Sequence, residues 1–190
     1  FGTAVGITAA AVDADATASV TYSLTDSAED LFVVDENRCV AVGWSNILLT
    51  EDGGSSWEIS THAKIGRSVY FIDENRGWTA GNNGAILSTI DGGNNWSYDS
   101  LGIYYWFTDI KFENELVGWA SAYAGWVFYT SDGGKSWQTQ KRNTYKDFYS
   151  LCFADQDRGW VVGDLGTILH TDNGGIVGLK PANEIIQNTI

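Results

Sequence analysis

The feature that most constrains this chain is a short turn sequence that recurs four times. It reads Thr-x-Asp-Gly-Gly-x-x-Trp at residues 50–57, 89–96 and 130–137, and a reduced copy with Asn for Asp and no Trp occupies residues 171–175. Asp followed by Gly-Gly between apolar runs predicts a hairpin, because Gly adopts positive φ and the carboxylate accepts local backbone N–H groups. The Trp that follows should fold back under the turn and pack. Each copy is therefore expected to be a turn between two strands that its own Asp and Trp side chains hold in place.

The segments around these turns repeat as well. Residues 71–78 and 153–160 share the pattern Phe-x-Asp-x-x-Arg-Gly-Trp, and parts of the pattern recur in the other two copies. A period of about 40 residues with four short strands per unit is typical of propeller blades. The sequence therefore predicts an all-β fold, a partial β-propeller of about four four-stranded blades over residues 31–175.

This repeat resembles a known family. Thr/Ser-x-Asp-x-Gly-x-x-Trp is the Asp-box, and the longer pattern is similar to the repeat of the photosystem II assembly-factor-like propeller family. Asp-boxes also occur in sialidases, sortilin-type receptors and xyloglucan-degrading propeller glycosidases. The resemblance implies a structural role for the box residues, which here are Asp52 and Trp57, Asp91 and Trp96, and Asp132 and Trp137.

Composition narrows the classes of function. Asp and Glu number 24 against 11 Lys and Arg, a net charge of −13, which argues against nucleic acid and against anionic membranes as partners. No apolar run is long enough to span a bilayer, so membrane insertion is not expected. Cys39 and Cys152 fall in different blades, so we expect them to be unpaired small core residues.

The two ends of the chain do not fit the repeat. Residues 1–30 are expected to be a β segment, either the tail of a cadherin-like repeat, which they resemble, or a closing strand for a blade. That resemblance makes Asp13 and Asp15 weak calcium candidates, although two carboxylates fall short of the six to eight oxygens that calcium takes. Residues 176–190 resemble the linker before a C-terminal sorting domain of secreted bacterial proteins. The chain contains no Met and starts at Phe1, so we expect a piece of a longer polypeptide, with the remaining blades or flanking domains as its neighbours.

Segments that join one blade to the next are expected to gather at one face. They are rich in aromatic residues, which suit a sugar- or peptide-binding surface because flat rings stack while their polar tips hydrogen-bond. The alternative is that these rings are ordinary core between blades. The candidate ligand-binding residues are Arg67, Tyr104, Tyr105, Trp106, Asp109, Tyr145, Asp147 and Tyr149.

Catalysis has less support in the sequence. A sialidase needs three converging arginines, whereas Arg38, Arg76 and Arg158 occupy one repeat position and should be spread around the array. Asp109 and Asp147 lie on neighbouring blades and could face each other as a glycosidase pair, which needs carboxylates about 5–10 Å apart. We predict no catalytic residue, no metal and no cofactor.

The sequence thus predicts a non-enzymatic propeller module, secreted or at the surface of a bacterial cell, that binds a glycan or a protein. A fragment of a propeller glycoside hydrolase, a photosystem II assembly chaperone and a plain structural spacer remain as alternatives.

Overall fold

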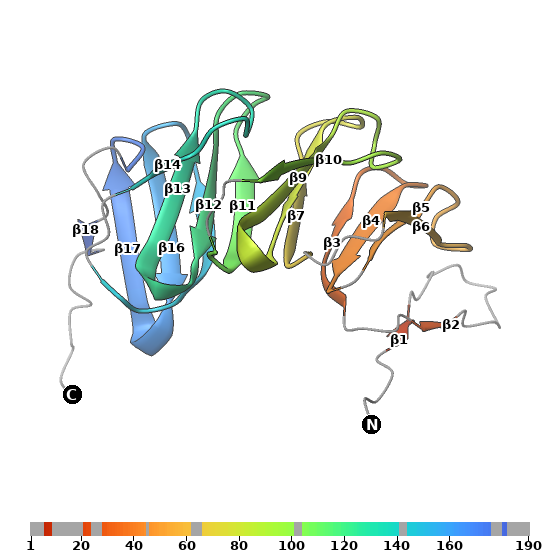
Figure 1. The fold of residues 1–190 in the computed structure, drawn as a ribbon, viewed down its shortest axis with the longest axis horizontal. Helices are drawn as coiled ribbons and strands as arrows, with labels where there is room; N and C mark the ends of the chain where they lie inside the picture. The colour runs from red at the N-terminus through yellow and green to blue at the C-terminus, as the bar shows by residue number, and fades with distance from the viewer. Residues whose placement is uncertain are drawn as a thin grey trace, which may run out of the picture. The chain divides into compact units, whose positions relative to one another are not determined.

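The computed structural model describes residues 6–8, 21–23, 28–44, 46–61, 66–100, 104–140, 144–175 and 180–181. The chain divides into two compact units, Phe1–Tyr104 and Tyr105–Ile190. Strands dominate both units, and all the strand pairs are antiparallel (Figure 1). Over the described ranges, no helix has the length and apolar character needed to cross a membrane.

The first unit holds two four-stranded sheets, blades 1 and 2, in which each strand pairs with the next one in the chain. Blade 1 consists of β3 (Ala28–Val33), β4 (Cys39–Gly43), β5 (Ile47–Thr50) and β6 (Glu58–Thr61). Blade 2 consists of β7 (Ser68–Phe71), β8 (Gly77–Ala80), β9 (Ala85–Thr89) and β10 (Ser97–Ser100), with the 3-10 turn η1 (Asn82–Gly84) before β9.

The second unit repeats this arrangement in blades 3 and 4. Blade 3 consists of β11 (Phe107–Phe112), β12 (Gly118–Ala122), η2 (Tyr123–Gly125), β13 (Trp126–Thr130) and β14 (Gln138–Thr139). Blade 4 consists of β15 (Phe148–Phe153), β16 (Arg158–Gly163), η3 (Asp164–Gly166), β17 (Thr167–Asp172) and β18 (Lys180–Pro181). The predicted all-β fold of four-stranded blades is confirmed.

Two segments outside the predicted blades, one at each end of the chain, contain short strands. β1 (Gly6–Thr8) and β2 (Thr21–Ser23) form a separate two-stranded sheet, so the predicted N-terminal strand pairs there and joins no blade. Asp13 and Asp15, the calcium candidates, lie outside the described residues. At the other end, β18 pairs with β17, so blade 4 has a short fourth strand inside the segment that was expected to be a linker.

The Asp-box turns are held by internal hydrogen bonds, as predicted. The threonine also takes part in these bonds, which the sequence did not reveal. In the first box Gly54 N–H donates to Thr50 Oγ1 (2.9 Å), and that hydroxyl donates to Asp52 Oδ1 (2.8 Å). The same carboxylate oxygen accepts the N–H of Ser56 (2.8 Å). Gly53 and Gly54 have φ of 69° and 89°, which only glycine adopts readily. The boxes around Asp91 and Asp132 repeat these bonds.

Within each unit, an aspartate ties the first blade to the second. Asp30 Oδ2 of blade 1 accepts the N–H of Val69 in blade 2 (2.9 Å). In the second unit Asp109 Oδ2 accepts both the N–H of Leu151 (3.0 Å) and the hydroxyl of Ser150 (2.8 Å). Asp30 and Asp109 pair with equivalent residues of the second strand, so they occupy one repeat position. A carboxylate that accepts backbone N–H groups from the neighbouring blade fixes the register between the two sheets.

Apolar side chains fill the space between the paired blades. Blade 1 contributes Val40, Val42, Ile47 and Leu49 to the first core, and blade 2 contributes Val69, Phe71, Ala85 and Leu87. Blade 3 contributes Trp119 and Val127 to the second core, and blade 4 contributes Phe148, Leu151, Val161 and Leu169.

Trp119 of blade 3 contacts the turn of the fourth box, which lacks a tryptophan of its own. The indole Nε1 of Trp96 in blade 2 donates to the carbonyl oxygen of Gly93 in its own turn (3.0 Å), and Trp137 in blade 3 does the same with Gly134 (2.9 Å). In blade 4 Nε1 of Trp119, which comes from blade 3, donates to the carbonyl of Gly174 (3.3 Å), the first glycine of the turn, whereas Gly93 and Gly134 are the second glycines of theirs. The Trp119 ring also stacks on Phe153 at 3.7 Å. A neighbouring blade therefore supplies the indole.

One prediction about the cysteines is wrong. Both thiols are free, and Cys39 is half-buried, where burial raises its pKa. Cys152 was expected in the core but is exposed. Its cross-strand partner is Trp160, so both side chains lie on one face of blade 4, and that face is open.

Candidate ligand-binding surface

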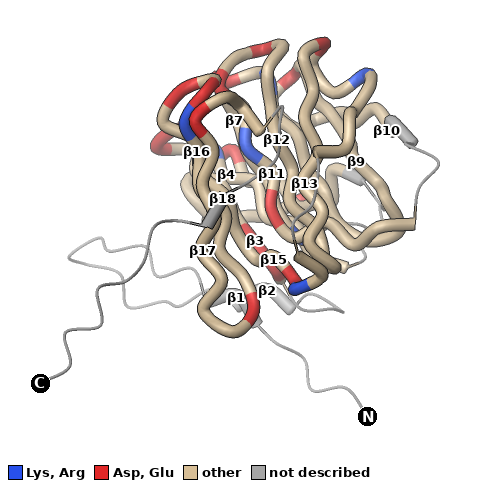
Figure 2. Tube along the Cα trace, turned by 90° about the vertical axis from the view of Figure 1, so that its left-hand side faces the viewer, with Lys and Arg blue, Asp and Glu red and all other residues tan. Residues whose placement is uncertain are grey.

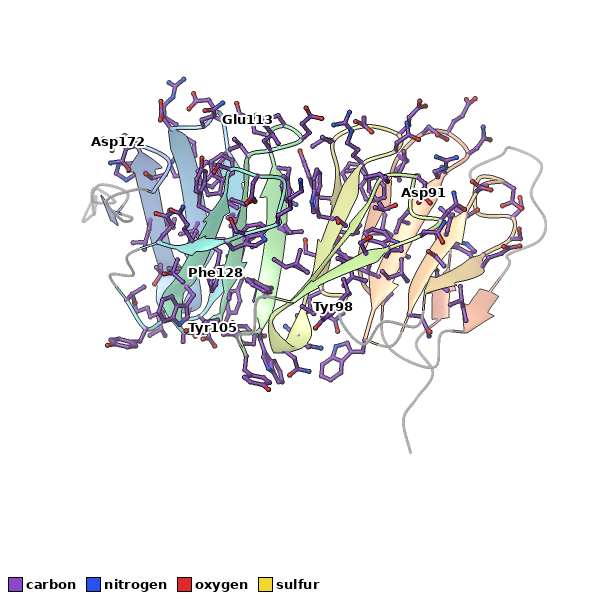
Figure 3. All side chains as sticks on the ribbon, turned by 45° about the horizontal axis from the view of Figure 1, so that its top comes forward. Asp91, Tyr98, Tyr105, Glu113, Phe128 and Asp172 are labelled. Atoms are coloured by element: carbon purple, nitrogen blue, oxygen red, sulfur yellow. The ribbon has the colours of Figure 1, made fainter. Side chains whose placement is uncertain are left out.

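In the second unit the sheets have two chemically different ends. One end carries the Asp-box turns and the acidic turns between the first two strands, and the other carries η2, η3 and the connectors at 105–106 and 144–147. Figure 3 shows Tyr105 at the opposite end of this unit from Glu113 and Asp172. Aromatic residues therefore collect at the end away from the Asp-boxes.

The loops at this aromatic end are bound to one another. The N–H of Tyr123 in η2 donates to the carbonyl of Trp106 (3.1 Å), which holds the first connector against blade 3. Asp147 joins three segments: its Oδ1 accepts the N–H of Ala124 (2.8 Å), and its carbonyl accepts the N–H of Asp164 in η3 (2.9 Å). The loops therefore form one supported surface.

Five side chains give this surface its character, and we call them the aromatic loop surface: Trp106, Tyr123, Tyr145, Tyr149 and Leu165. Leu165 and Tyr145 have exposed fractions of 87% and 78%, Trp106 and Tyr149 are also exposed, and Tyr123 is half-buried. The rings of Trp106 and Tyr123 lie 6.2 Å apart. Large rings on backbone held by hydrogen bonds lose little entropy on binding, as expected for a recognition site.

Leu165 stands in an unfavourable backbone conformation. Its φ is 54°, and the same repeat position holds Asn83 (58°) in blade 2 and Ala124 (57°) in blade 3. Asn tolerates this left-handed region, but a branched apolar residue there is strained by about 1–3 kcal/mol. A strained and almost fully exposed leucine contributes nothing to the core, so it is a candidate for ligand contact.

Tyr149 is held in place by an acid on η3. Its hydroxyl donates a short hydrogen bond to Asp164 Oδ1. This bond, together with the nearby carboxylates, raises the pKa of Tyr149 to about 12. The phenol therefore stays protonated at neutral pH, and its ring is fixed in direction.

The predicted site residues separate into two groups in this unit. Trp106, Tyr145, Asp147 and Tyr149 come together at the aromatic loop surface. Tyr105 instead packs on Trp126 and Phe128, with ring centroids 5.0 and 5.4 Å away, as core aromatics do. Asp109 is buried and its carboxylate ties blade 3 to blade 4.

The remaining two candidates belong to the first unit. Tyr104 has an exposed fraction of 89%. The guanidinium of Arg67 lies 5.9 Å from the ring centre of Trp44, and its Nε donates to Asn82 Oδ1 (3.3 Å). Sequence reasoning missed Tyr123 and Leu165, because both lie in turns between the second and third strands of a blade, and the site was expected only in the connectors between blades. The available signal was an apolar residue at a position where blade 2 has Asn.

The arrangement gives little support to catalysis or metal binding. The carboxylates of Asp109 and Asp147, the pair considered for glycoside cleavage, each accept backbone N–H groups in the fold. Arg76 and Arg158 form ion pairs with the acids three residues before them. In the ranges that the structure describes, no group of three or more His, Cys, Asp or Glu side chains is placed to hold a metal ion.

Comparison with known proteins supports the fold and the repeat. Residues 100–172 match the family model described as photosynthesis system II assembly factor YCF48. No curated protein matches the chain. Among solved structures, YCF48 bound to D1 peptide is 21% identical, with a TM-score of 0.56, over 82% of this chain and 68% of that one. YCF48 from Cyanidioschyzon merolae is 20% identical, with a TM-score of 0.63, over 78% of this chain and 51% of that one.

An ancestral GH74 enzyme is also similar, with 18% identity and a TM-score of 0.67 over 84% of this chain but only 24% of that enzyme. At these identities the likeness concerns the fold. The blades are Asp-box propeller blades whose repeats resemble those of the photosystem II assembly-factor-like family, as the sequence predicted.

Proposed function

We propose that this chain is a non-enzymatic module that binds a polypeptide segment through the aromatic loop surface. The observation that carries the proposal is the concentration of exposed rings and Leu165 on loops that Asp147 holds together. Aromatic side chains of this kind dominate the energetics of protein interfaces, because they bury much apolar area and still offer a polar tip.

A polypeptide fits better than a glycan for two reasons. A solved relative of the fold is described as YCF48 bound to D1 peptide, so an Asp-box propeller of this type can hold a peptide. Leu165 and the neighbouring rings of Trp106 and Tyr123 offer an apolar contact, whereas glycan sites also need several polar groups on the sugar hydroxyls. The net charge of −13, visible in the excess of acidic positions in Figure 2, favours peptides that combine apolar residues with Lys or Arg.

The test is selection from a phage-displayed library of random short peptides, with the D1 peptide as one defined probe and a glycan array in parallel. The dissociation constant of a selected peptide is then measured for wild type, Tyr145→Ala and Leu165→Asn. We expect each variant to bind at least about tenfold more weakly, the scale of an interface hot spot.

Tyr98→Ala is the matched control, because Tyr98 is exposed on β10 of the other unit and lies outside the surface. It should bind as wild type does. Recovery of glycans but no peptides, or peptides whose affinity is the same for Tyr145→Ala and wild type, would refute the proposal.

The proposal includes two further points: the module is not an enzyme, and it has a particular cellular location. The GH74 likeness makes glycoside hydrolysis the activity to test, by incubating the chain with xyloglucan and measuring released sugar. We expect none above the level of an Asp109→Asn, Asp147→Asn double variant. We further propose that the host cell is bacterial and that the module is secreted or surface-attached, which fractionation of that host would test.

A further inference from the structure

The aromatic loop surface also carries two acidic side chains, Asp147 in the connector and Asp164 in η3. They are neighbours in space, because the carbonyl of Asp147 accepts the N–H of Asp164 (2.9 Å). Both side chains are partly exposed. Among the residues that the structure describes, neither carboxylate forms an ion pair, although Lys146 stands next to Asp147 in the connector. The surface therefore has a local negative charge that the described part of the fold does not neutralise.

Each of the two carboxylates uses only one of its oxygens in the described part of the fold. Oδ1 of Asp147 accepts the N–H of Ala124 (2.8 Å), and Oδ1 of Asp164 accepts the hydroxyl of Tyr149. The Oδ2 atoms of both acids accept no hydrogen bond from the described residues. A carboxylate has about four lone-pair positions, so each acid can accept further N–H donors while it still supports its loop.

The ring of Tyr149 lies close to both acids. The hydrogen bond to Asp164 is the largest cause of the raised pKa of Tyr149, and the negative charges of Asp164 and Asp147 add to it, so both carboxylates are near the phenol. Tyr149 is 51% exposed, and Tyr145, two residues before Asp147, is exposed still further. Open aromatic faces attract cations through the ring quadrupole, and the two carboxylates add to that attraction.

Two glycines fix the acids against the rings. The connector passes so close to η2 and η3 that a Cβ on Gly125 would overlap the carbonyl oxygen of Thr144, and a Cβ on Gly163 would overlap that of Asp147. Backbone oxygens cannot move away as a flexible side chain can, so each position accepts only glycine. Asp147 and Asp164 are therefore set in place before a ligand binds, which lowers the entropy that binding costs.

We propose that Asp147, Asp164 and Tyr149 form a subsite for an arginine side chain of the bound polypeptide. This inference rests on the proposed function and adds the residue type that the peptide must offer. A guanidinium group is flat, so it can stack on a ring while its N–H groups donate to the two carboxylates at its edge. A lysine ammonium is a compact and more strongly hydrated charge, so it gains less from the ring.

Leu165 indicates what should stand beside the arginine. It follows Asp164 directly in η3 and is 87% exposed, so an apolar side chain next to the arginine can pack on it. Acidic or phosphorylated peptides should be repelled by the same two carboxylates. The ligand class is therefore a polypeptide that carries arginine next to an apolar residue.

The test compares two blocked tripeptides, acetyl-Leu-Arg-Gly-amide and the same peptide with citrulline, which has nearly the shape of arginine but no charge. Dissociation constants are measured by titration in nuclear magnetic resonance, from the amide shifts of the protein. The arginine peptide should move the amides of residues 147, 149 and 164 and bind at least about threefold more tightly than the citrulline peptide. This comparison needs no protein variant.

Protein variants then locate the effect. Asp164→Asn removes the charge and keeps an oxygen for the hydroxyl of Tyr149, so it should weaken the arginine peptide at least about threefold and leave the citrulline peptide unchanged. Asp157→Asn is the matched control, because it removes one charge from an exposed side chain of the same blade, in the acidic turn at the Asp-box end. It should leave both dissociation constants unchanged.

Equal or undetectable binding of the two tripeptides overturns the inference. An equal loss from Asp157→Asn and Asp164→Asn also overturns it, because that result would show only a general attraction to an acidic protein. Neither outcome touches the proposed function if library peptides still depend on Tyr145. An arginine preference that depends on Asp164, with no peptide recovered from the library, would instead uphold the subsite and refute the binding of longer polypeptides.

Discussion

Trp119 and Trp160 are tryptophans at equivalent positions of blades 3 and 4. The structure predicts that replacing Trp119 costs much stability and that replacing Trp160 costs little. Trp119 is 1% exposed, stacks on Phe153 at 3.7 Å and donates to the carbonyl of Gly174. Trp160, on β16 of blade 4, is 41% exposed. A Trp→Ala change at each site therefore compares a buried indole with an open one in a shared backbone context.

The magnitude follows from burial. Replacing a buried Trp by Ala costs about 3–5 kcal/mol, which includes the cavity that is left. At Trp119 the buried carbonyl of Gly174 also loses its donor, so we expect the upper part of this range. For a monomeric sample the Trp160→Ala variant should lose about 1 kcal/mol or less, as is usual for exposed substitutions.

The assay is urea unfolding followed by far-ultraviolet circular dichroism, at a protein concentration where sedimentation shows a monomer. This signal reports strand content. If the two variants lose the same free energy of unfolding, within about 1 kcal/mol, then the contact of Trp119 with the fourth turn does not stabilise the fold.

Three further predictions follow. Hydrogen bonds, chiefly the one from Ser56, lower the pKa of Asp52 to about 2. The Asp52 carboxylate therefore stabilises the fold fully above about pH 4, and this contribution is lost as the pH falls through about 2. The urea midpoints of wild type and Asp52→Asn should converge in that window, and a constant difference would contradict this. Asp109→Ala leaves the buried N–H of Leu151 without its acceptor and should lower the free energy of unfolding by about 1.5–3 kcal/mol, whereas a loss below 0.5 kcal/mol in urea melts would show that the latch is dispensable. Leu165→Asn relieves left-handed strain and should raise the urea midpoint while weakening peptide binding; a lower midpoint would argue against strain at this turn.

The repeat architecture could be predicted from the sequence because its determinants are local. Gly-Gly after Asp fixes the turn through backbone conformation, and the spacing of the boxes fixes the number of strands between them. The threonine of the box was missed, although its hydroxyl is the centre of the turn, because a Thr before a turn also reads as an ordinary strand residue.

The sequence predicted the candidate site only where a side chain is exposed because its residue lies in or beside a connector between blades. Tyr145 and Tyr149 lie in or beside a connector and are exposed as expected. Asp109 also follows a connector, but the strand begins at Phe107, so its side chain turns into the blade-to-blade contact. That outcome depends on the partner N–H of Leu151, some 40 residues away, which no local pattern reveals. The hydrogen bond from Trp119 to the turn that lacks a tryptophan is likewise a contact between blades.

The central claim is that a polypeptide binds at the aromatic loop surface, and hydrogen exchange tests it most directly. Amide exchange is measured on wild type alone and with a saturating peptide selected from the library. We predict slower exchange in bound samples at residues 104–106, 123–125, 144–149 and 164–166, with the Asp-box turns at 52–56 and 91–95 unchanged. Protection at those turns, with none in the four loops, would contradict the account.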